Sequence, residues 1–370
     1  MTSQRLGARE WLALSRLPGL RASQLTELAA TATAWPDGWL ALLPREAATL
    51  LRLWLDHPGR SPLSDEIARA EAWLAEAPDR HLLYPGHPSW PTLLAEIPDP
   101  PPLLWAWGDL AALAPPRLAM VGARRATREG LTNAATFARE LAGRGWCVVS
   151  GMALGIDAAA QQAALDAGGP SVAVLGCGVD VAYPPRHHRL HARLREPGGL
   201  LLAEHPPGTP ARPGFFPRRN RIVTGLSFGV LVVEAAERSG SLVSARLAGE
   251  QGREVFALPG SIHNPQASGC LRLIRDGAVL VRDVDDIVAE LTQWLPALSP
   301  LTLPGQAPAE GEALPSDPLL RWLSGNPTPV DTLVGLSGLG IAECQRRLLE
   351  LELEGRVAHA AGGWVRLSGA

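Results

Sequence analysis

The chain has 370 residues, of which 46% are hydrophobic and 19% charged, and its formal net charge is −3. This length exceeds what one ordinary hydrophobic core accommodates, so a globular protein of two or three domains is expected. The sequence has no uninterrupted run of about 18 apolar residues, and its N-terminus lacks the apolar core of a secretory signal. Both features argue against a membrane-spanning or exported protein and favour a cytoplasmic one.

The basic residues are unusual in type and in distribution. All 34 are arginine, because the sequence contains no lysine. Contacts to anions must therefore use the planar guanidinium group, which binds phosphate in a bidentate manner and stacks on bases. Residues 117–221 hold fourteen arginines against seven acidic residues, whereas the rest of the chain is acidic. This distribution predicts one face that binds a polyanion.

Residues 1–78 are expected to form a small domain of short helices. The segment WLALSRLPGLRASQLTELA has the leucine spacing and the Pro-Gly turn of two helices, and it resembles a helix–hairpin–helix or SAM-like element. Arg21 stands where the helix–hairpin–helix motif has its second glycine. A hairpin that binds phosphate and a simple packing module therefore remain alternatives for this segment.

The next segment, 79–295, alternates short apolar strands with glycine-containing turns and helical patterns. The predicted strands are 118–124, 146–151, 171–178, 200–205, 229–235, 254–260 and 278–281. Nearly continuous Val, Leu and Ala runs between helices are typical of a buried parallel sheet with right-handed crossovers. The fold class is therefore predicted to be α/β, with an extended Rossmann-like, doubly wound parallel sheet that the residues before 118 extend.

Two further segments complete the chain. Residues 296–317 are rich in proline and alanine and are predicted to be a linker. Residues 318–370 contain three short helical patterns and then a β-hairpin around Gly362, an order typical of a winged-helix domain. Its candidate recognition helix mixes Arg346 and Arg347 with four glutamates, which favours protein contact or a purely structural role over tight duplex binding.

Residues suited to binding anions follow several of the predicted strands. In an open α/β sheet, ligands bind beyond the carboxyl ends of the strands. The segment FFPRRNRIVTGLS also places three arginines at the start of a predicted helix, where they do not stabilise the helix dipole, so they indicate a polyanionic ligand. The predicted site residues are Gly122, Arg124, Arg125, Ser150, Gly151, Phe216, Arg218, Arg219, Asn220, Arg221, Arg238, Ser239, Gly240 and Ser241. For the glycines a turn requirement is the alternative, and for the two serines of the last turn it is helix capping.

Other kinds of site do not match the sequence. A dinucleotide-binding turn requires a third glycine after Gly176-Cys177-Gly178, which this sequence lacks, and without lysine there is no P-loop of the usual kind. No catalytic nucleophile–base pair is recognisable by spacing, and no cofactor is predicted. His187, His188 and His191 lack partner ligands at metal-binding spacing and are expected to form a solvated helix face. The four cysteines are expected to be reduced core thiols.

The runs VGAR, SGMALGID, FPRRNRIVTGLS, VVEAAERSGSLVSARLAGEQGREVFALPG and SGCLRLIRDGA together resemble the DprA/Smf family of DNA-processing proteins. The resemblance implies a non-catalytic, cytoplasmic protein that binds single-stranded DNA in natural transformation, protects it and loads the RecA recombinase onto it. It implies DNA contacts at Arg124, Ser150, Gly151 and residues 216–221. It also implies a homodimer through the Rossmann-like domain, with 271–278 as the candidate surface.

Two other classes of protein remain alternatives to this one. Rossmann-like hydrolases of nucleoside monophosphates carry a P-G-G-x-G-T-x-x-E pattern, and the turn from Arg238 to Ser244 lacks its proline, paired glycines and glutamate. A protein adaptor with a vestigial pocket is the other alternative, and the basic segment argues against it.

Overall fold

The structure is a computed structural model that describes residues 6–31, 34–292, 319–320, 322–323, 328–360 and 363–366. The chain divides into two compact units, Met1–Ala297 and Leu298–Ala370. The predicted linker at 296–317 lies outside the described residues, and the three boundaries between the four predicted segments remain predictions. Within the described ranges, no helix combines the length and the apolar character that a membrane crossing requires.

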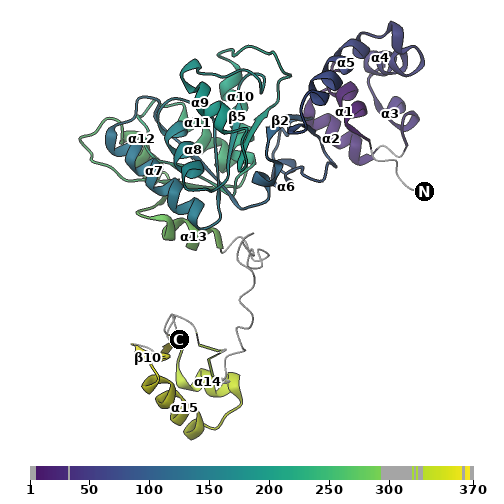
Figure 1. The fold of residues 1–370 in the computed structure, drawn as a ribbon. Helices are drawn as coiled ribbons and strands as arrows, with labels where there is room; N and C mark the ends of the chain where they lie inside the picture. The colour runs from purple at the N-terminus through teal and green to yellow at the C-terminus, as the bar shows by residue number, and fades with distance from the viewer. Residues whose placement is uncertain are drawn as a thin grey trace. The chain divides into compact units, whose positions relative to one another are not determined.

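A nine-stranded sheet forms the centre of the first unit (Figure 1). Its order is β1-β2-β6-β5-β4-β3-β7-β8-β9. The strands are β1 (Arg80–Leu83), β2 (Leu104–Gly108), β3 (Arg117–Val121), β4 (Cys147–Ser150), β5 (Ser171–Leu175), β6 (Gly199–Ala203), β7 (Gly229–Val232), β8 (Glu254–Ala257) and β9 (Val279–Leu280). From β6 to β9 all neighbours are parallel, whereas β1 and β2 extend the sheet antiparallel. All seven predicted strands are present, and the predicted α/β fold with an extended Rossmann-like sheet is confirmed.

The strand order reverses at β3. Leu118 of β3 aligns with Val148 of β4 on one side and with Gly229 of β7 on the other. From β3 the chain first proceeds through β4, β5 and β6 and then returns to the other side through β7, β8 and β9. The loops that leave β3 and β7 therefore diverge, and they leave a crevice at the carboxyl edge of the sheet, where open α/β folds bind ligands.

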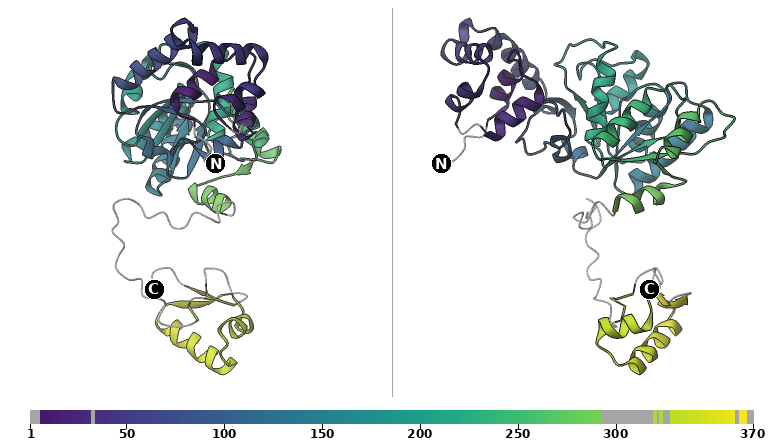
Figure 2. Two further views of the ribbon diagram at one scale, coloured as in Figure 1. Left: turned by 90° about the vertical axis from the view of Figure 1, so that its right-hand side faces the viewer. Right: turned by 180° about the vertical axis from the view of Figure 1, so that it is seen from behind.

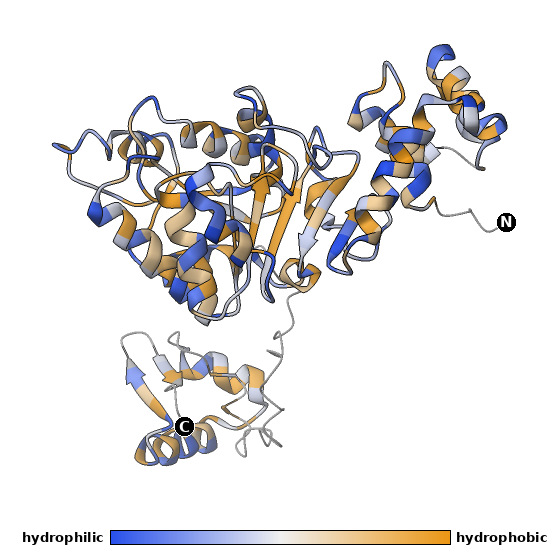
Figure 3. Ribbon diagram, turned by 45° about the horizontal axis from the view of Figure 1, so that its top comes forward, coloured by the Kyte–Doolittle hydropathy of each residue, from blue (hydrophilic) through white to orange (hydrophobic). Residues whose placement is uncertain are grey.

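Helices cover both faces of the sheet because its strands are apolar on both sides. Leu118 and Met120 pack on one face, under α7 (Arg128–Gly143), α8 (Ile156–Asp166) and α13 (Val284–Thr292). Ala119 and Val121 pack on the other face, under α6 (Thr92–Ala95), α10 (Phe215–Gly225), α11 (Ser241–Glu250) and α12 (Ser268–Arg275). Figure 2 shows this layering from two further sides, and Figure 3 shows orange apolar strands between the helices.

The helices before the sheet are α1 (Ala8–Ser15), α2 (Ala22–Thr31), α3 (Asp37–Leu42), α4 (Arg45–Asp56) and α5 (Pro62–Ala75), with a 3-10 turn at Pro58–Arg60. Their tryptophan- and leucine-rich core continues into residues of β2, β5 and β6. The Trp73 ring meets Trp105 of β2 edge-on at 5.5 Å between centroids. Arg80 lies against the rings of both Trp73 and Trp107, at 4.8 and 4.5 Å. Aromatic and cation–π packing therefore joins these helices to the edge of the sheet.

Three shorter helical elements complete the first unit: 3-10 turns at Leu110–Leu113 and Pro185–His187, and α9 (His188–Arg193). The second unit contains α14 (Val330–Ser337), α15 (Ile341–Leu353) and the antiparallel hairpin of β10 (Val357–Ala360) and β11 (Gly363–Arg366). Leu333, Cys344, Leu348 and Val357 are among its core residues. Two helices followed by a hairpin match the predicted winged helix, whose first predicted helix falls mostly outside the described residues.

All four cysteines lie buried in these cores, as predicted. Burial raises the pKa of the Cys147 thiol to about 12 and those of Cys177 and Cys270 to about 11. The thiols are therefore protonated at neutral pH and act as small apolar side chains.

Candidate nucleic-acid interface

A groove of about 730 Å³ lies at the switch point between β3 and β7. It is lined by the loops that follow β3, β4 and β7 and by the first turns of α10 and α11. Eleven of the fourteen predicted site residues line it: Gly122, Arg124, Arg125, Gly151, Phe216, Arg219, Asn220, Arg238, Ser239, Gly240 and Ser241. Residues far apart in the chain thus converge at one edge of the sheet.

One face of α10 forms a wall of the groove. Phe216, Arg219, Asn220 and Val223 line it. Their spacing of i, i+3, i+4 and i+7 is the spacing of one helix face. Pro217 lies in the first turn, where proline fits a helix, as the sequence predicts.

The most unusual side chain of this wall is Arg219. It is only 7% exposed, yet it lines the groove. Its Nη1 donates to Val174 O at 2.6 Å, whereas its Nε is buried and has no acceptor among the described residues. Burial lowers the pKa of Arg219, and the nearby Asp157 carboxylate opposes that shift. A largely buried cation in the wall of an open groove, with no ion-pair partner among the described residues, is suited to receive an anion.

Gly151 makes room for this arginine. A Cβ atom at position 151 would overlap the Arg219 guanidinium. The sequence offered a turn requirement or a phosphate contact as the reasons for this glycine. The structure shows a third reason, since the guanidinium packs directly against the Gly151 backbone.

The β4–α8 turn differs from the expected phosphate cradle. Gly151 N donates to Asp157 Oδ2 at 3.1 Å, and Ala153 N donates to the same oxygen at 3.3 Å. Burial raises the pKa of Asp157, while Arg219 and the two N–H groups oppose the shift. Ser150 is fully buried, does not line the groove, and its hydroxyl donates to Met120 O at 2.6 Å. The polar groups expected to hold phosphate are thus bonded within the protein.

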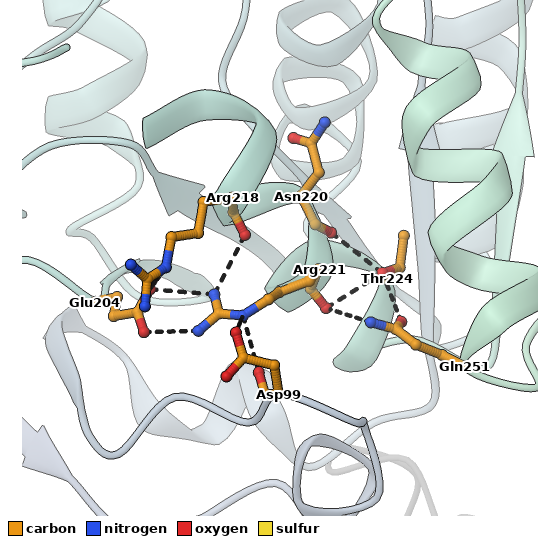
Figure 4. A network of polar contacts seen from close by, with 7 residues as sticks. All are labelled: Asp99, Glu204, Arg218, Asn220, Arg221, Thr224 and Gln251. Atoms are coloured by element: carbon orange, nitrogen blue, oxygen red, sulfur yellow. Dashed lines mark hydrogen bonds and ion pairs between the residues drawn. The ribbon is translucent and has the colours of Figure 1, made fainter. Parts of the chain in front are cut away.

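Arg221 does not line the groove, which corrects the expectation that all three arginines of this run do. Figure 4 shows Arg221 in a network of polar contacts with Glu204 and Asp99. Arg221 is 7% exposed, its Nη2 lies 2.6 Å from Glu204 Oε1, and its Nε lies 3.0 Å from Asp99 Oδ2. Arg218 is exposed and also lies outside the groove lining, with its Nε 3.8 Å from Glu204. Helix geometry explains the difference, because Arg221 lies about 200° around the helix axis from Arg219 and therefore points to the other side of α10.

Two aromatic rings meet at the edge of the groove. Tyr183 and Phe216 both line it, with centroids 5.3 Å apart and planes inclined by 31°. A Cβ at Gly176 would lie 2.9 Å from the Phe216 ring, so the absence of a side chain there admits the ring. Tyr183 was missed by the sequence reasoning, because nothing in its own loop marks it as a neighbour of α10. Phe215 instead stacks on His205 at 3.9 Å, outside the groove lining.

The opposite wall carries Arg124, Arg125 and Arg238. All three are exposed, and none has a carboxylate within ion-pair distance in the part of the chain that the structure describes. At the start of α11, the hydroxyl groups of Ser239 and Ser241 are 2.6 Å apart, and Ser241 N donates to Ser239 Oγ. These serines therefore organise their own turn, while the arginines stay available to a ligand.

A second groove of about 700 Å³ adjoins the first and shares Arg124 and Arg125 with it. Arg186 and Arg189, both exposed, line its other side. None of the described residues that line it is acidic. The two grooves together form a continuous surface rich in unpaired arginine.

The histidines beside this surface correct another expectation. His191 is only 5% exposed, and its Nε2 lies 2.8 Å from Val179 O. His187 Nδ1 lies 3.0 Å from Met152 O, and only His188 is exposed. The predicted solvated face is therefore wrong for His191, because α9 packs this side of the helix against the protein.

The fold and the groove together define a Rossmann-like protein with an arginine-rich groove at its switch point and a winged-helix unit at its C-terminus. Residues 81–292 match the family of DNA recombination-mediator protein A, and residues 304–363 match the DprA winged helix domain. The chain belongs to this DprA/Smf family of DNA-processing proteins.

Relatives and solved structures agree with this assignment. Protein Smf of Escherichia coli is 41% identical over 362 residues, which cover 96% of this chain and 95% of the relative. The crystal structure of DNA processing protein A from Streptococcus pneumoniae has 34% identity and a TM-score of 0.62, and it covers 78% of this chain and 99% of that one. A Helicobacter pylori structure, described for its single-stranded DNA binding mode, has 32% identity and a TM-score of 0.51 over 55% of this chain and 93% of that one.

Proposed function

We propose that this protein binds single-stranded DNA in the groove at the switch point, without altering it chemically. The observation that carries the proposal is Arg219, a largely buried guanidinium that lines the groove and has no carboxylate within ion-pair distance among the described residues. A DNA phosphate is an anion that this group can hold by a charge-assisted hydrogen bond. The Helicobacter pylori relative, whose structure was described for its single-stranded DNA binding mode, supports the same ligand class.

The surrounding side chains suggest a path for the strand. Arg124 and Arg125 join the two grooves, so successive phosphates can pass from Arg219 toward Arg186 and Arg189. The rings of Phe216 and Tyr183 offer a surface on which an unpaired base stacks. Stacking of this kind requires a base that is free of its partner, and it does not read sequence. The proposed site therefore favours single strands over duplex.

The wider role follows from the family. We propose that the protein acts in the cytoplasm, protects incoming single strands in natural transformation, and loads RecA onto them as a homodimer formed through the Rossmann-like domain. The hydrolase alternative has no specific observation in its favour, since the turn from Ser239 to Ser241 lacks the pattern of those enzymes.

The experiment is a titration of labelled oligo-dT and of a duplex with the full chain, across a range of salt concentrations. We expect preferential binding of the single strand, with a log–log salt slope of roughly −0.7 for each phosphate neutralised. Equal affinity for duplex, or binding without salt dependence, would contradict the proposal. For the wider role, the assay is RecA filament formation on strands that a single-strand-binding protein already covers.

Replacing Phe216 by alanine is expected to weaken oligo-dT binding by about 1–3 kcal/mol, because a base loses its stacking partner. Phe215→Ala is the matched control, since its ring stacks on His205 outside the groove lining. Fluorescence anisotropy of labelled oligo-dT measures both. Equal losses in the two variants would show that the ring in the groove has no special role.

A further inference from the structure

The loop between β3 and α7 carries Arg124 and Arg125, and both of its ends are bonded to one residue of the neighbouring strand exit. At one end, Ala123 N donates to the backbone oxygen of Glu234 at 2.7 Å. At the other end, Thr127 N donates to the two carboxylate oxygens of Glu234 at 3.0 and 3.3 Å, and the Thr127 hydroxyl donates to the same carboxylate. The two arginines thus lie on a short span that Glu234 fixes at both ends.

The packing around Glu234 keeps it in this position. Glu234 is only 5% exposed. A Cβ at Gly130 would lie 2.5 Å from its Oε2, and a Cβ at Gly122 would lie 2.9 Å from its backbone oxygen. The Thr127 hydroxyl also accepts a hydrogen bond from Gly130 N at 3.0 Å, which ties the same contact to the start of α7. A side chain at either glycine would therefore clash with Glu234, which explains why glycine occupies both positions.

Glu234 also stands at the start of the segment that leads to Arg238, so it connects the two loops that supply the exposed arginines of this wall. A carboxylate near a site for a polyanion opposes binding through simple electrostatics. A fixed loop has the opposite effect, because ordering the arginines in advance lowers the entropy lost on binding. We infer that Glu234 is a positioning residue that holds Arg124 and Arg125, through Thr127, in the arrangement that receives DNA phosphates. This inference rests on the proposed function of the groove.

The two effects have opposite signs in the variant Glu234→Ala. Loss of a negative charge alone would tighten binding of oligo-dT, whereas loss of the positioning contact weakens it. We expect the full chain with Glu234→Ala to bind about tenfold more weakly. The salt slope should fall by about 0.7 for each arginine that no longer engages a phosphate. Glu237→Ala removes the same charge from an exposed residue outside the groove lining, and it should bind at least as tightly as wild type.

Thr127 supplies a second pair of variants that leaves the buried carboxylate in place. Thr127→Val loses the hydroxyl and should weaken binding about three- to tenfold, whereas Thr127→Ser keeps it and should stay within about twofold of wild type. Thermal unfolding confirms that each variant is folded at the assay temperature. Wild-type affinity and salt slope in Glu234→Ala or in Thr127→Val would overturn the inference. Failure of the wild type to bind oligo-dT would overturn the proposed function itself, so the two failures are distinguishable.

Discussion

The variant Arg219→Ala is expected to lose about 2–4 kcal/mol of oligo-dT binding free energy, or roughly 30- to 900-fold in Kd. Arg219 is the buried cation of the groove wall, and no carboxylate of the described residues lies within ion-pair distance of it. Removing a partner from a desolvated, charge-assisted contact has a much larger effect than removing an exposed arginine. Anisotropy titrations at several salt concentrations should also show that the slope of log affinity against log salt concentration is smaller than in wild type by about 0.7.

Two further variants separate binding from folding. Arg219→Ala leaves the buried Asp157 carboxylate without the cation that stabilises its charged form. The thermal unfolding of this variant must therefore be measured together with its DNA binding. The double variant Arg219→Leu with Asp157→Asn removes both charges and restores neutrality in the interior. Arg246→Ala, an exposed arginine outside the groove lining, is the charge control and should bind normally. If the double variant is stable and still binds as wild type does, Arg219 is not the phosphate contact.

Arg221→Ala should show the reverse pattern, with a large loss of stability and little change in affinity. Arg221 and Glu204 are both largely buried, at 8% and 13% side-chain exposure, and removing one partner leaves the other unpaired. Loss of a buried partner costs about 3–5 kcal/mol of unfolding free energy. We expect a fall in Tm of roughly 10 °C. The folded variant should keep its Kd for oligo-dT within about twofold, since Arg221 faces away from the groove.

Arg218→Ala is the matched control on the same helix. Its side chain is 60% exposed and reaches Glu204 only at 3.8 Å. An exposed ion pair of this kind contributes less than about 1 kcal/mol, so calorimetry should register almost no change. A stable Arg221→Ala protein with lost DNA binding would contradict the division of roles on α10 that the structure shows.

The sheet could be predicted well from the sequence, because its strands are apolar on both faces and each is followed by a glycine-containing turn. The strands β3 to β9 all fall within the predicted runs or one residue from them. The antiparallel extension was only anticipated as an addition before residue 118, since pairing partners such as Trp105 and Ala203 are distant in the chain. Strand order likewise depends on long-range contacts that local patterns do not encode.

Most of the predicted site residues line the groove, but the sequence analysis did not predict how they are arranged around it. The arginine-rich run was treated as a unit, although helical periodicity already separates Arg219 from Arg221. Applying that period to residues 215–225 would have grouped Phe216, Arg219 and Asn220, which the structure brings to the groove. Tyr183 could not have been found this way, because its contact with α10 joins two separate loops.

The fit between Gly151 and Arg219 has a consequence for how this protein can vary. The guanidinium occupies the space that any larger residue at position 151 would need, so the two positions are complementary in size. A side chain at 151 therefore requires either a displaced guanidinium or a shorter residue at position 219. Across related sequences, we therefore expect positions 151 and 219 to change together, although one lies in the β4–α8 turn and the other in α10. Such paired variation would identify chains that have replaced this buried cation with another way of holding their ligand.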